Sequence, residues 1–147
     1  MADNPTVHAS AVLLGAKAVL IRGPSGSGKS KLAFDLILAA ETKALPFARL
    51  VSDDRTFLEA RNGVLLARPP AELAGLLEVR GLGIRRLPYE PVAAVGLVVD
   101  LSAKGSRLPA PQERATTIQG VTLARLGAPA EAGVLGLLLA ALRTSGV

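Results

Sequence analysis

The chain has 147 residues, half of them hydrophobic, with a net charge of +5 and a pI of about 10.2. This length is typical of one domain, and its core must be aliphatic because aromatic residues make up only 3%. The absence of Cys excludes disulfides and thiolate metal sites. The amino terminus has no signal-peptide pattern, and the longest apolar run, Ala132–Leu142, is too short to span a membrane. We therefore expect a soluble, cytoplasmic protein without a membrane partner.

The basic charge does not by itself indicate nucleic-acid binding. The Arg residues are dispersed along the chain, one Tyr and three Phe form no stacking platform, and no nucleic-acid motif is present. The charge suits nucleotide phosphates or an acidic protein partner equally well. We expect no nucleic-acid partner.

The predicted elements describe an α/β domain with several hairpins. The predicted strands, in chain order, are Val7–Leu14, Lys17–Arg22, Ala48–Ser52, Thr56–Ala60, Val64–Ala67, Ala93–Leu101 and one near Thr116–Leu123. The first two are joined at Gly15-Ala16, and Asn62-Gly63 predicts a second hairpin because both residues tolerate positive φ. Two hairpins favour a mixed sheet over a purely parallel one.

Three helices and one long loop complete the prediction. A helix begins at Lys29, with one apolar face made by Ala33, Leu36, Ile37 and Ala40. A short helix follows Pro69-Pro70 and carries Leu73, Leu76 and Leu77, and a last helix covers Ala130–Leu142. Polar and Pro-containing residues predict a loop over Ser102–Gln112.

The segment between the second strand and the first helix matches the phosphate-binding pattern G-x-x-x-x-G-K-[ST] in full. Its residues are Gly23, Pro24, Ser25, Gly26, Ser27, Gly28, Lys29 and Ser30. Glycines let successive N–H groups point into one anion-sized cavity, and the new helix adds the positive end of its dipole. We expect Lys29 to contact the outer phosphates of a nucleoside triphosphate and Ser30 to ligate Mg²⁺.

A nucleotide enzyme of this kind also needs a carboxylate, and the residues offer two candidates. Asp53 and Asp54 directly follow a predicted strand. Two adjacent carboxylates repel each other unless a cation lies beside them or one of them has a raised pKa. They are a possible site or a solvated turn. Asp100 ends an apolar strand as a Walker B aspartate does, or else it caps the following loop.

Three further polar residues have an ordinary structural interpretation beside a functional one. His8 is either a surface residue at a strand start or a catalytic group. Glu78 and Arg80 lie two residues apart, so they share a face if extended and form a plain salt bridge by default.

The stretch Leu76–Ile84, L-L-E-V-R-G-L-G-I, resembles the signature L-L-E-I-R-G-L-G-I of HPr kinase/phosphorylase. The other pieces occur in that family's order: His8 after a strand start, the phosphate-binding loop, the D-D-R of Asp53–Arg55, a hairpin and then the signature. The resemblance covers His8 to Leu101. It implies a single catalytic domain over residues 1–147, with a mixed sheet and hairpins like that of phosphoenolpyruvate carboxykinase.

The resemblance also implies an activity: transfer of the γ-phosphate of ATP, with Mg²⁺, to a serine of HPr or another small phosphocarrier protein. Asp53 matches the general base, and His8 matches the histidine that tunes it. Ser30 and Glu78 match Mg²⁺ ligands, with Asp54 assisting. Arg80 is expected to face the phosphates, and Asp100 becomes structural. Family members are hexamers, so we expect a homo-oligomer.

Departures from the family pattern leave alternatives open. Arg85-Arg86-Leu87-Pro88 replaces an apolar, Asp-containing run, which puts the reverse, phosphorylase reaction in question. Arg125 is a weak counterpart of a C-terminal phosphate-contacting Arg. The arginines also suit a kinase for an acidic small metabolite. A third possibility is a nucleotide-sensing regulator without catalysis, in which Asp53 would be incidental.

Overall fold

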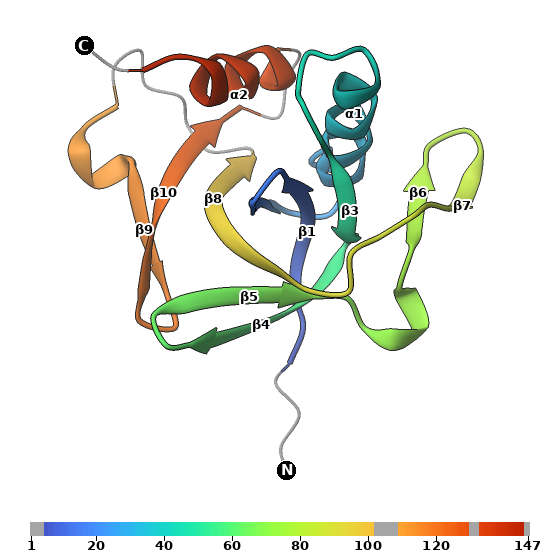
Figure 1. Ribbon diagram of the computed structural model, residues 1–147, viewed down its shortest axis with the longest axis horizontal. Helices are drawn as coiled ribbons and strands as arrows, with labels where there is room; N and C mark the ends of the chain where they lie inside the picture. Colours follow the sequence, from blue (N-terminus) through green and yellow to red (C-terminus); the bar gives the residue numbers. More distant parts are fainter. Residues whose placement is uncertain (1–4, 102–108, 130–132, 146–147) are drawn as a thin grey trace.

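A mixed β-sheet built mainly from hairpins is the centre of the fold (Figure 1). The computed structural model describes residues 5–101, 109–129 and 133–145. The strands of the main sheet are β1 (Val7–Leu14), β2 (Lys17–Arg22), β3 (Arg49–Ser52), β4 (Arg55–Arg61), β5 (Val64–Arg68), β8 (Ala93–Leu101), β9 (Ala115–Ile118) and β10 (Val121–Ala128). A separate hairpin consists of β6 (Leu76–Val79) and β7 (Gly83–Arg86).

The strand pairing confirms the predicted mixed sheet. Strand β8 pairs parallel with β2 on one side and with β10 on the other, whereas the remaining pairs are antiparallel. Strands β2, β1, β4, β5 and β8 pair in a closed circuit, because β8 also returns to β2. The parallel β2–β8 pair brings the carboxyl ends of these strands together at Arg22 and Asp100, directly before the loop that begins at Gly23.

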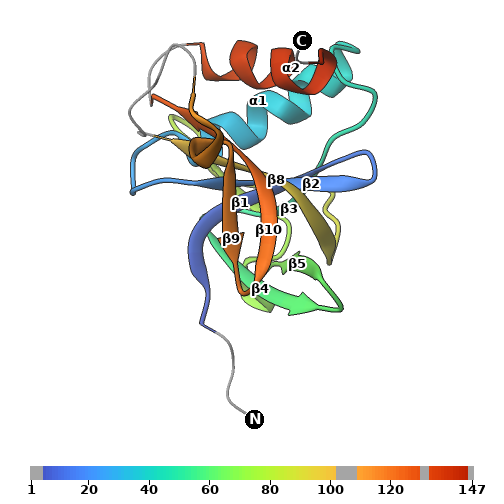
Figure 2. The same ribbon diagram turned by 90° about the vertical axis from the view of Figure 1, so that its left-hand side faces the viewer.

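Two helices cover one face of the sheet, as Figure 2 shows in profile. Helix α1 (Lys29–Glu41) packs Leu32 and Leu36 into a core with strand residues such as Ile21, and α2 (Val134–Arg143) adds Leu138 to the same cluster. Each such buried leucine stabilises the fold by about 1.5–3 kcal/mol relative to an exposed one. This packing fixes the start of α1 beside the end of β2, where the loop Gly23–Gly28 lies.

A second cluster fills the opposite face of the sheet. It contains small and branched residues, among them Ala11, Leu20, Leu65 and Val98. Within the described ranges, neither helix is long and apolar enough to cross a membrane.

The predicted helix after Pro70 is wrong. Only Ala71–Leu73 is helical, as a single 3-10 turn, and the chain then turns at Gly75 into strand β6. Gly75 has a φ of +76°, which no helix tolerates, and Leu76 and Leu77 pair across with Arg86 and Arg85. Leu77 and Val79, two residues apart on β6, pack into the core, which is the alternation of a half-buried strand.

The carboxyl-terminal elements also differ from the prediction. The strand expected near Thr116–Leu123 is a hairpin of β9 and β10, turned by Gln119 (φ +49°) and Gly120 (φ +81°). The last helix begins at Val134, and its expected residues 130–132 lie outside the described ranges. The predicted loop over 102–112 is described only from Pro109, where Pro111–Glu113 forms a 3-10 turn.

Candidate active site

The loop between β2 and α1 curls back on its own backbone. Gly26 (φ +80°) and Gly28 (φ +100°) both have the left-handed conformation that glycine allows without strain. Ser27 N donates to Pro24 O at 3.0 Å, which closes the turn. Lys29 is almost fully buried, and its Nζ donates to Gly23 O at 3.0 Å and to Pro24 O at 3.2 Å. The ammonium group is therefore held inside the loop, as a phosphate-binding lysine requires.

Asp53 lies against the first turn of α1. The residue is 8% exposed, and its carboxylate accepts a hydrogen bond from Ser30 Oγ, which lies 2.8 Å from Oδ1 and 2.9 Å from Oδ2. The backbone N of Glu78, on β6, donates to Oδ2 at 3.3 Å. Donors from α1 and β6 thus meet at the carboxylate of Asp53, which directly follows β3.

Ser10 is a third donor to Asp53 that the sequence alone did not reveal. Strand β1 pairs with β3 so that Ala11 lies opposite Ser52, which places Ser10 beside Asp53. Ser10 Oγ is buried, donates to Asp53 Oδ1 at 2.8 Å and accepts from Asp54 N at 3.1 Å. The only sequence signal was a hydroxyl between Ala9 and Ala11 in a strand that is otherwise apolar from Ala9 to Leu14.

A second buried hydroxyl pair supports the turn that carries Asp53. Ser52 Oγ and Thr56 Oγ1 are 2.6 Å apart, and Thr56 Oγ1 donates to Ala9 O at 2.8 Å. Asp54 itself has a φ of +67°, and its carbonyl accepts from Ala9 N at 3.2 Å. These contacts fasten the tight turn to β1, so the position of Asp53 is set by buried structure and not by a mobile loop.

The remaining predicted site residues have exposed side chains. Asp54 is exposed beside Asp53. Glu78 is also exposed, and its backbone rather than its carboxylate contacts Asp53. Arg80 is exposed in the β6–β7 turn. His8 is exposed on β1, where it pairs in register with Arg55, and within the described ranges its imidazole makes no hydrogen bond to Asp53.

Asp100 lies between two arginines. Arg22 donates from Nε and Nη2 to its two oxygens at 2.7 and 2.8 Å, and Arg125 Nε donates at 2.6 Å. Burial alone would raise the pKa of Asp100, but the hydrogen bonds and charges of the two arginines outweigh it and hold the pKa below its ordinary value. This agrees with a structural role for Asp100. Arg125, in turn, is engaged by Asp100 and by Glu113 O.

The loop fits a phosphate group. Ser27 Oγ is buried and has no hydrogen-bond partner among the described residues, which leaves a donor directed within the loop. A Cβ at Gly23 would lie only 2.5 Å from Ser27 Oγ, so a larger residue at this position would force the loop apart. No group of three or more His, Asp or Glu side chains gathers in the described part of the chain.

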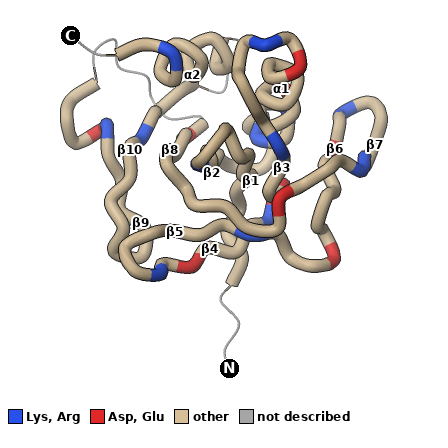
Figure 3. The backbone as a smooth tube through the Cα atoms, viewed as in Figure 1, with Lys and Arg blue, Asp and Glu red and all other residues tan. Residues whose placement is uncertain are grey.

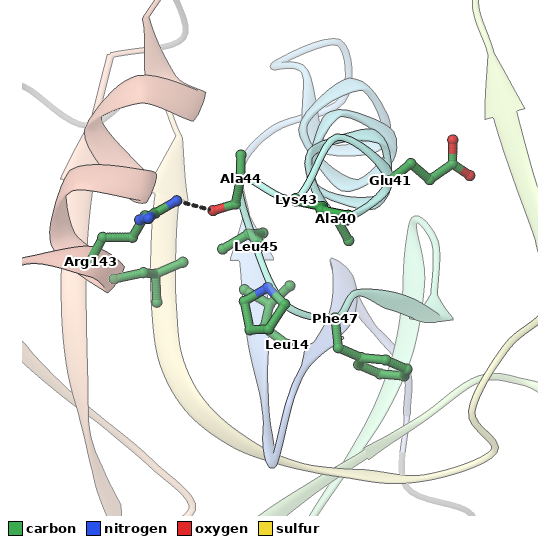
Figure 4. Close-up of a pocket in the computed structure, with 10 residues that line it drawn as sticks. Leu14, Ala40, Glu41, Lys43, Ala44, Leu45, Phe47 and Arg143 are labelled. Carbon is green, nitrogen blue, oxygen red and sulfur yellow. Dashed lines mark hydrogen bonds between the residues drawn. The ribbon is translucent and has the colours of Figure 1, made fainter.

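An open cavity of about 730 Å³ lies elsewhere, between the carboxyl ends of α1 and α2 (Figure 4). Its walls include Leu14, Ala44 and Phe47, and Arg143 Nη1 donates to Ala44 O across it at 2.7 Å. None of the predicted site residues lines it.

Comparison with known proteins agrees with this arrangement. The family model described as the HPr Serine kinase C-terminal domain matches residues 1–88. HPr kinase/phosphorylase of Clostridium acetobutylicum is 35% identical over 108 residues, which are 74% of this chain and 32% of that protein. HPr kinase/phosphorylase of Streptococcus thermophilus is 39% identical over 85 residues, 57% of this chain and 25% of that protein. The chain thus spans a third or less of the length of these curated relatives.

A solved structure extends the likeness beyond residue 88. The HPr(Ser) kinase/phosphatase from Coxiella burnetii superposes with a TM-score of 0.75 and 25% sequence identity, covering 94% of this chain and 93% of that one. The chain therefore belongs to the HPr serine kinase C-terminal domain family, as the family model, the relatives and the solved structure agree.

Proposed function

We propose that this chain is an ATP- and Mg²⁺-dependent protein serine kinase that transfers the γ-phosphate to a serine of HPr. The observation that carries the proposal is the contact between Asp53 and Ser30, whose oxygens are 2.8 Å apart. The contact joins a buried carboxylate to the last residue of the phosphate-binding pattern, which supports the proposal. A group accepting the proton of an attacking hydroxyl has to lie beside this loop.

The proposed reaction is a single in-line displacement. The serine oxygen forms a bond to the γ-phosphorus while the bond from that phosphorus to the β–γ bridging oxygen breaks, which releases ADP. Asp53 takes the proton of the serine hydroxyl. Ser10 Oγ and Glu78 N keep the carboxylate in place, since both donate to it independently of Ser30.

The loop residues supply positioning and positive charge. Lys29, the N–H groups of Gly26 and Gly28 and the hydroxyl of Ser27 would hold the outer phosphates, together with Gly23, Pro24 and Ser25 and, from the hairpin, Arg80. When bound, Mg²⁺ neutralises charge on the phosphate oxygens. Ser30, Glu78 and Asp54 are the residues that would hold it, with His8 near the acidic pair.

The family relationship supports further parts of the proposal. Residues 1–147 would act as one catalytic domain with a fold of the phosphoenolpyruvate-carboxykinase type, in the cytoplasm and as a homo-oligomer. HPr, or another small phosphocarrier protein, would be the acceptor. Phosphorylase activity is the weaker expectation, because Arg85 and Arg86 follow the signature where the family has an apolar run.

The test is transfer of label from γ-labelled ATP, with Mg²⁺, to purified HPr and to HPr with its acceptor serine changed to alanine. We expect label on wild-type HPr only. Asp53→Asn keeps the shape of the side chain but removes its basicity, so we expect transfer to fall by about 10²–10⁴-fold while nucleotide binding is retained.

Two results would contradict the proposal in different ways. ATP binding without label on HPr would remove HPr as the acceptor and favour a small acidic metabolite or a nucleotide sensor. Full transfer by Asp53→Asn would leave the kinase reaction standing and remove Asp53 as its base.

A further inference from the structure

The β6–β7 hairpin carries an apolar surface beside the candidate active site. Leu82 and Ile84 are 67% and 63% exposed, the highest values among large hydrophobic side chains in the described ranges. All four residues of β7 are exposed. Figure 1 shows the hairpin standing apart from the main sheet, and it pairs only with itself. Exposed apolar side chains gathered in one place mark an interaction surface more often than scattered ones do.

Strand pairing shows which face of the hairpin these residues occupy. Leu77 and Val79 pack into the helix-covered core, so the alternate residues Leu76 and Glu78 face away from it. Ile84 lies directly opposite Glu78, and Arg86 directly opposite Leu76. Cross-strand partners share a face, so Glu78, Ile84 and Arg86 form one outer surface.

This outer surface is continuous with the catalytic centre. Glu78 is both its central residue and the residue whose backbone N donates to Asp53 Oδ2 at 3.3 Å. An acceptor that presents a hydroxyl to Asp53 therefore meets Ile84 and Arg86 beside Glu78. A small acidic metabolite would not bury the exposed side chains of Leu82 and Ile84, whereas a docked protein surface would.

The charge of the hairpin indicates the chemistry of that protein. Arg80, Arg85 and Arg86 are exposed, and Glu78 is the one acidic residue between Leu76 and Arg86. None of the three arginines makes an ion pair with the described residues, and Figure 3 shows the basic segments on this hairpin. A second copy of the chain is a poor complement, because its net charge is +5 and a symmetric contact would oppose the two arginine clusters.

We propose that the outer face of the β6–β7 hairpin, with Ile84 and Arg86 on β7 and the exposed Leu82 in the adjoining turn, docks an acceptor protein that presents an apolar patch flanked by carboxylates. This rests on the proposed kinase function and adds the surface that selects a protein acceptor. The contact positions the acceptor hydroxyl at Asp53 and lies outside the phosphate-binding loop.

The test measures phosphate transfer to HPr as its concentration is varied at saturating Mg²⁺ and ATP. The variant Leu82→Ser/Ile84→Thr removes the apolar surface while keeping a β-branched residue in β7. We expect its KM for HPr to rise by about tenfold, with ATP affinity and melting temperature unchanged. The matched control is Val64→Thr, an exposed residue of the β4–β5 hairpin, for which we expect an unchanged KM.

Charge is tested separately with Arg86→Glu, using Arg61→Glu on the β4–β5 hairpin as control. We expect Arg86→Glu to raise the KM for HPr and to make it less dependent on salt concentration, since an attractive charge pair has been removed.

The outcomes separate the two proposals. Transfer to HPr with an unchanged KM in both hairpin variants overturns the docking surface and leaves the kinase function standing. A change in sedimentation of the hairpin variants without a change in KM assigns the surface to contacts between copies of the chain, which also overturns docking. No transfer by the unaltered chain overturns both.

Discussion

Ser10 Oγ and Asp53 Oδ1 are 2.8 Å apart, although 43 residues separate them in the chain. Because Asp54 N donates to Ser10 Oγ, the hydroxyl proton of Ser10 is directed to Asp53. The serine therefore orients the carboxylate from inside β1, where no solvent competes with it.

Removing this hydroxyl is expected to impair the proposed transfer without affecting nucleotide binding. A hydrogen bond to a charged group contributes about 1.5–3 kcal/mol, so Ser10→Ala should lower kcat for transfer to HPr by roughly tenfold or more. The KM and Kd for ATP should not change, because Ser10 does not touch the phosphate-binding loop. Steady-state kinetics and nucleotide titration check both quantities.

Ser10→Thr is the matched control for that variant. It keeps the hydroxyl and suits a strand, so kcat should return toward the wild-type value. Equal kcat values for Ser10→Ala and wild type would show that Ser30 and Glu78 N suffice to hold Asp53.

Much of this arrangement was predictable from local pattern. Alternation and turn residues predicted both amino-terminal hairpins, with β1 and β2 at the expected bounds. The phosphate-binding pattern predicted the loop and the start of α1 at Lys29. These features depend on neighbouring residues, where spacing and glycine conformation carry the information.

The features that were missed depend on long-range pairing. Ser10 acquires its partner only because β1 and β3 pair, and no local pattern encodes that register. Leu73, Leu76 and Leu77 have spacings compatible with a helix, but Leu77 is buried from β6 because Gly75 redirects the chain. Asp100 was expected to be structural from the family resemblance, but its two arginine partners, Arg22 and Arg125, are brought to it only by the fold.

The buried lysine of the loop should dominate nucleotide affinity. Lys29 Nζ already lies within the loop, bonded to two carbonyls, so its charge is in place before a phosphate arrives. Lys29→Ala should weaken the Kd for ATP by about 10–100-fold, the equivalent of one charge-assisted hydrogen bond. Titration calorimetry with Mg²⁺ and ATP measures this directly.

Lys31→Ala is the appropriate control, since Lys31 is on the same helical turn with a side chain that is 80% exposed and paired with Asp35. Its Kd for ATP should stay within about twofold of wild type, because an exposed ion pair contributes little. A similar loss of ATP affinity in both variants would indicate a general effect of positive charge rather than a specific contact of Lys29 with the phosphates.

Asp100 should contribute stability that depends on pH in a defined direction. Its pKa in the folded chain lies below the ordinary value of 3.8, so the folded state favours the ionised carboxylate. The contribution is then fully present above pH 3.8 and is lost as the pH falls through the folded pKa. We expect the free energy of unfolding of wild type to exceed that of Asp100→Asn at neutral pH.

The measurement is denaturant unfolding of both proteins as the pH is lowered. The difference between them should stay constant down to about pH 4 and shrink below it, because protonated Asp100 no longer attracts Arg22 and Arg125. A difference that grows on acidification would mean that burial, and not the arginines, controls this carboxyl group.

Two glycines should respond in opposite ways to the same substitution. At Gly75 an added Cβ would lie 2.9 Å from Tyr89 Cδ1 and 3.1 Å from Leu87 O, and φ is +76°. Gly75→Ala should therefore lower the free energy of unfolding by about 1–3 kcal/mol, since both steric contacts and the backbone conformation oppose it.

Gly136 lies within α2 with nothing within 4 Å of the new Cβ, so Gly136→Ala should raise the free energy of unfolding by about 0.5–1 kcal/mol. Thermal unfolding of both variants decides the matter. If Gly75→Ala is as stable as wild type, the sharp entry into β6 is not what holds the hairpin in position beside Asp53.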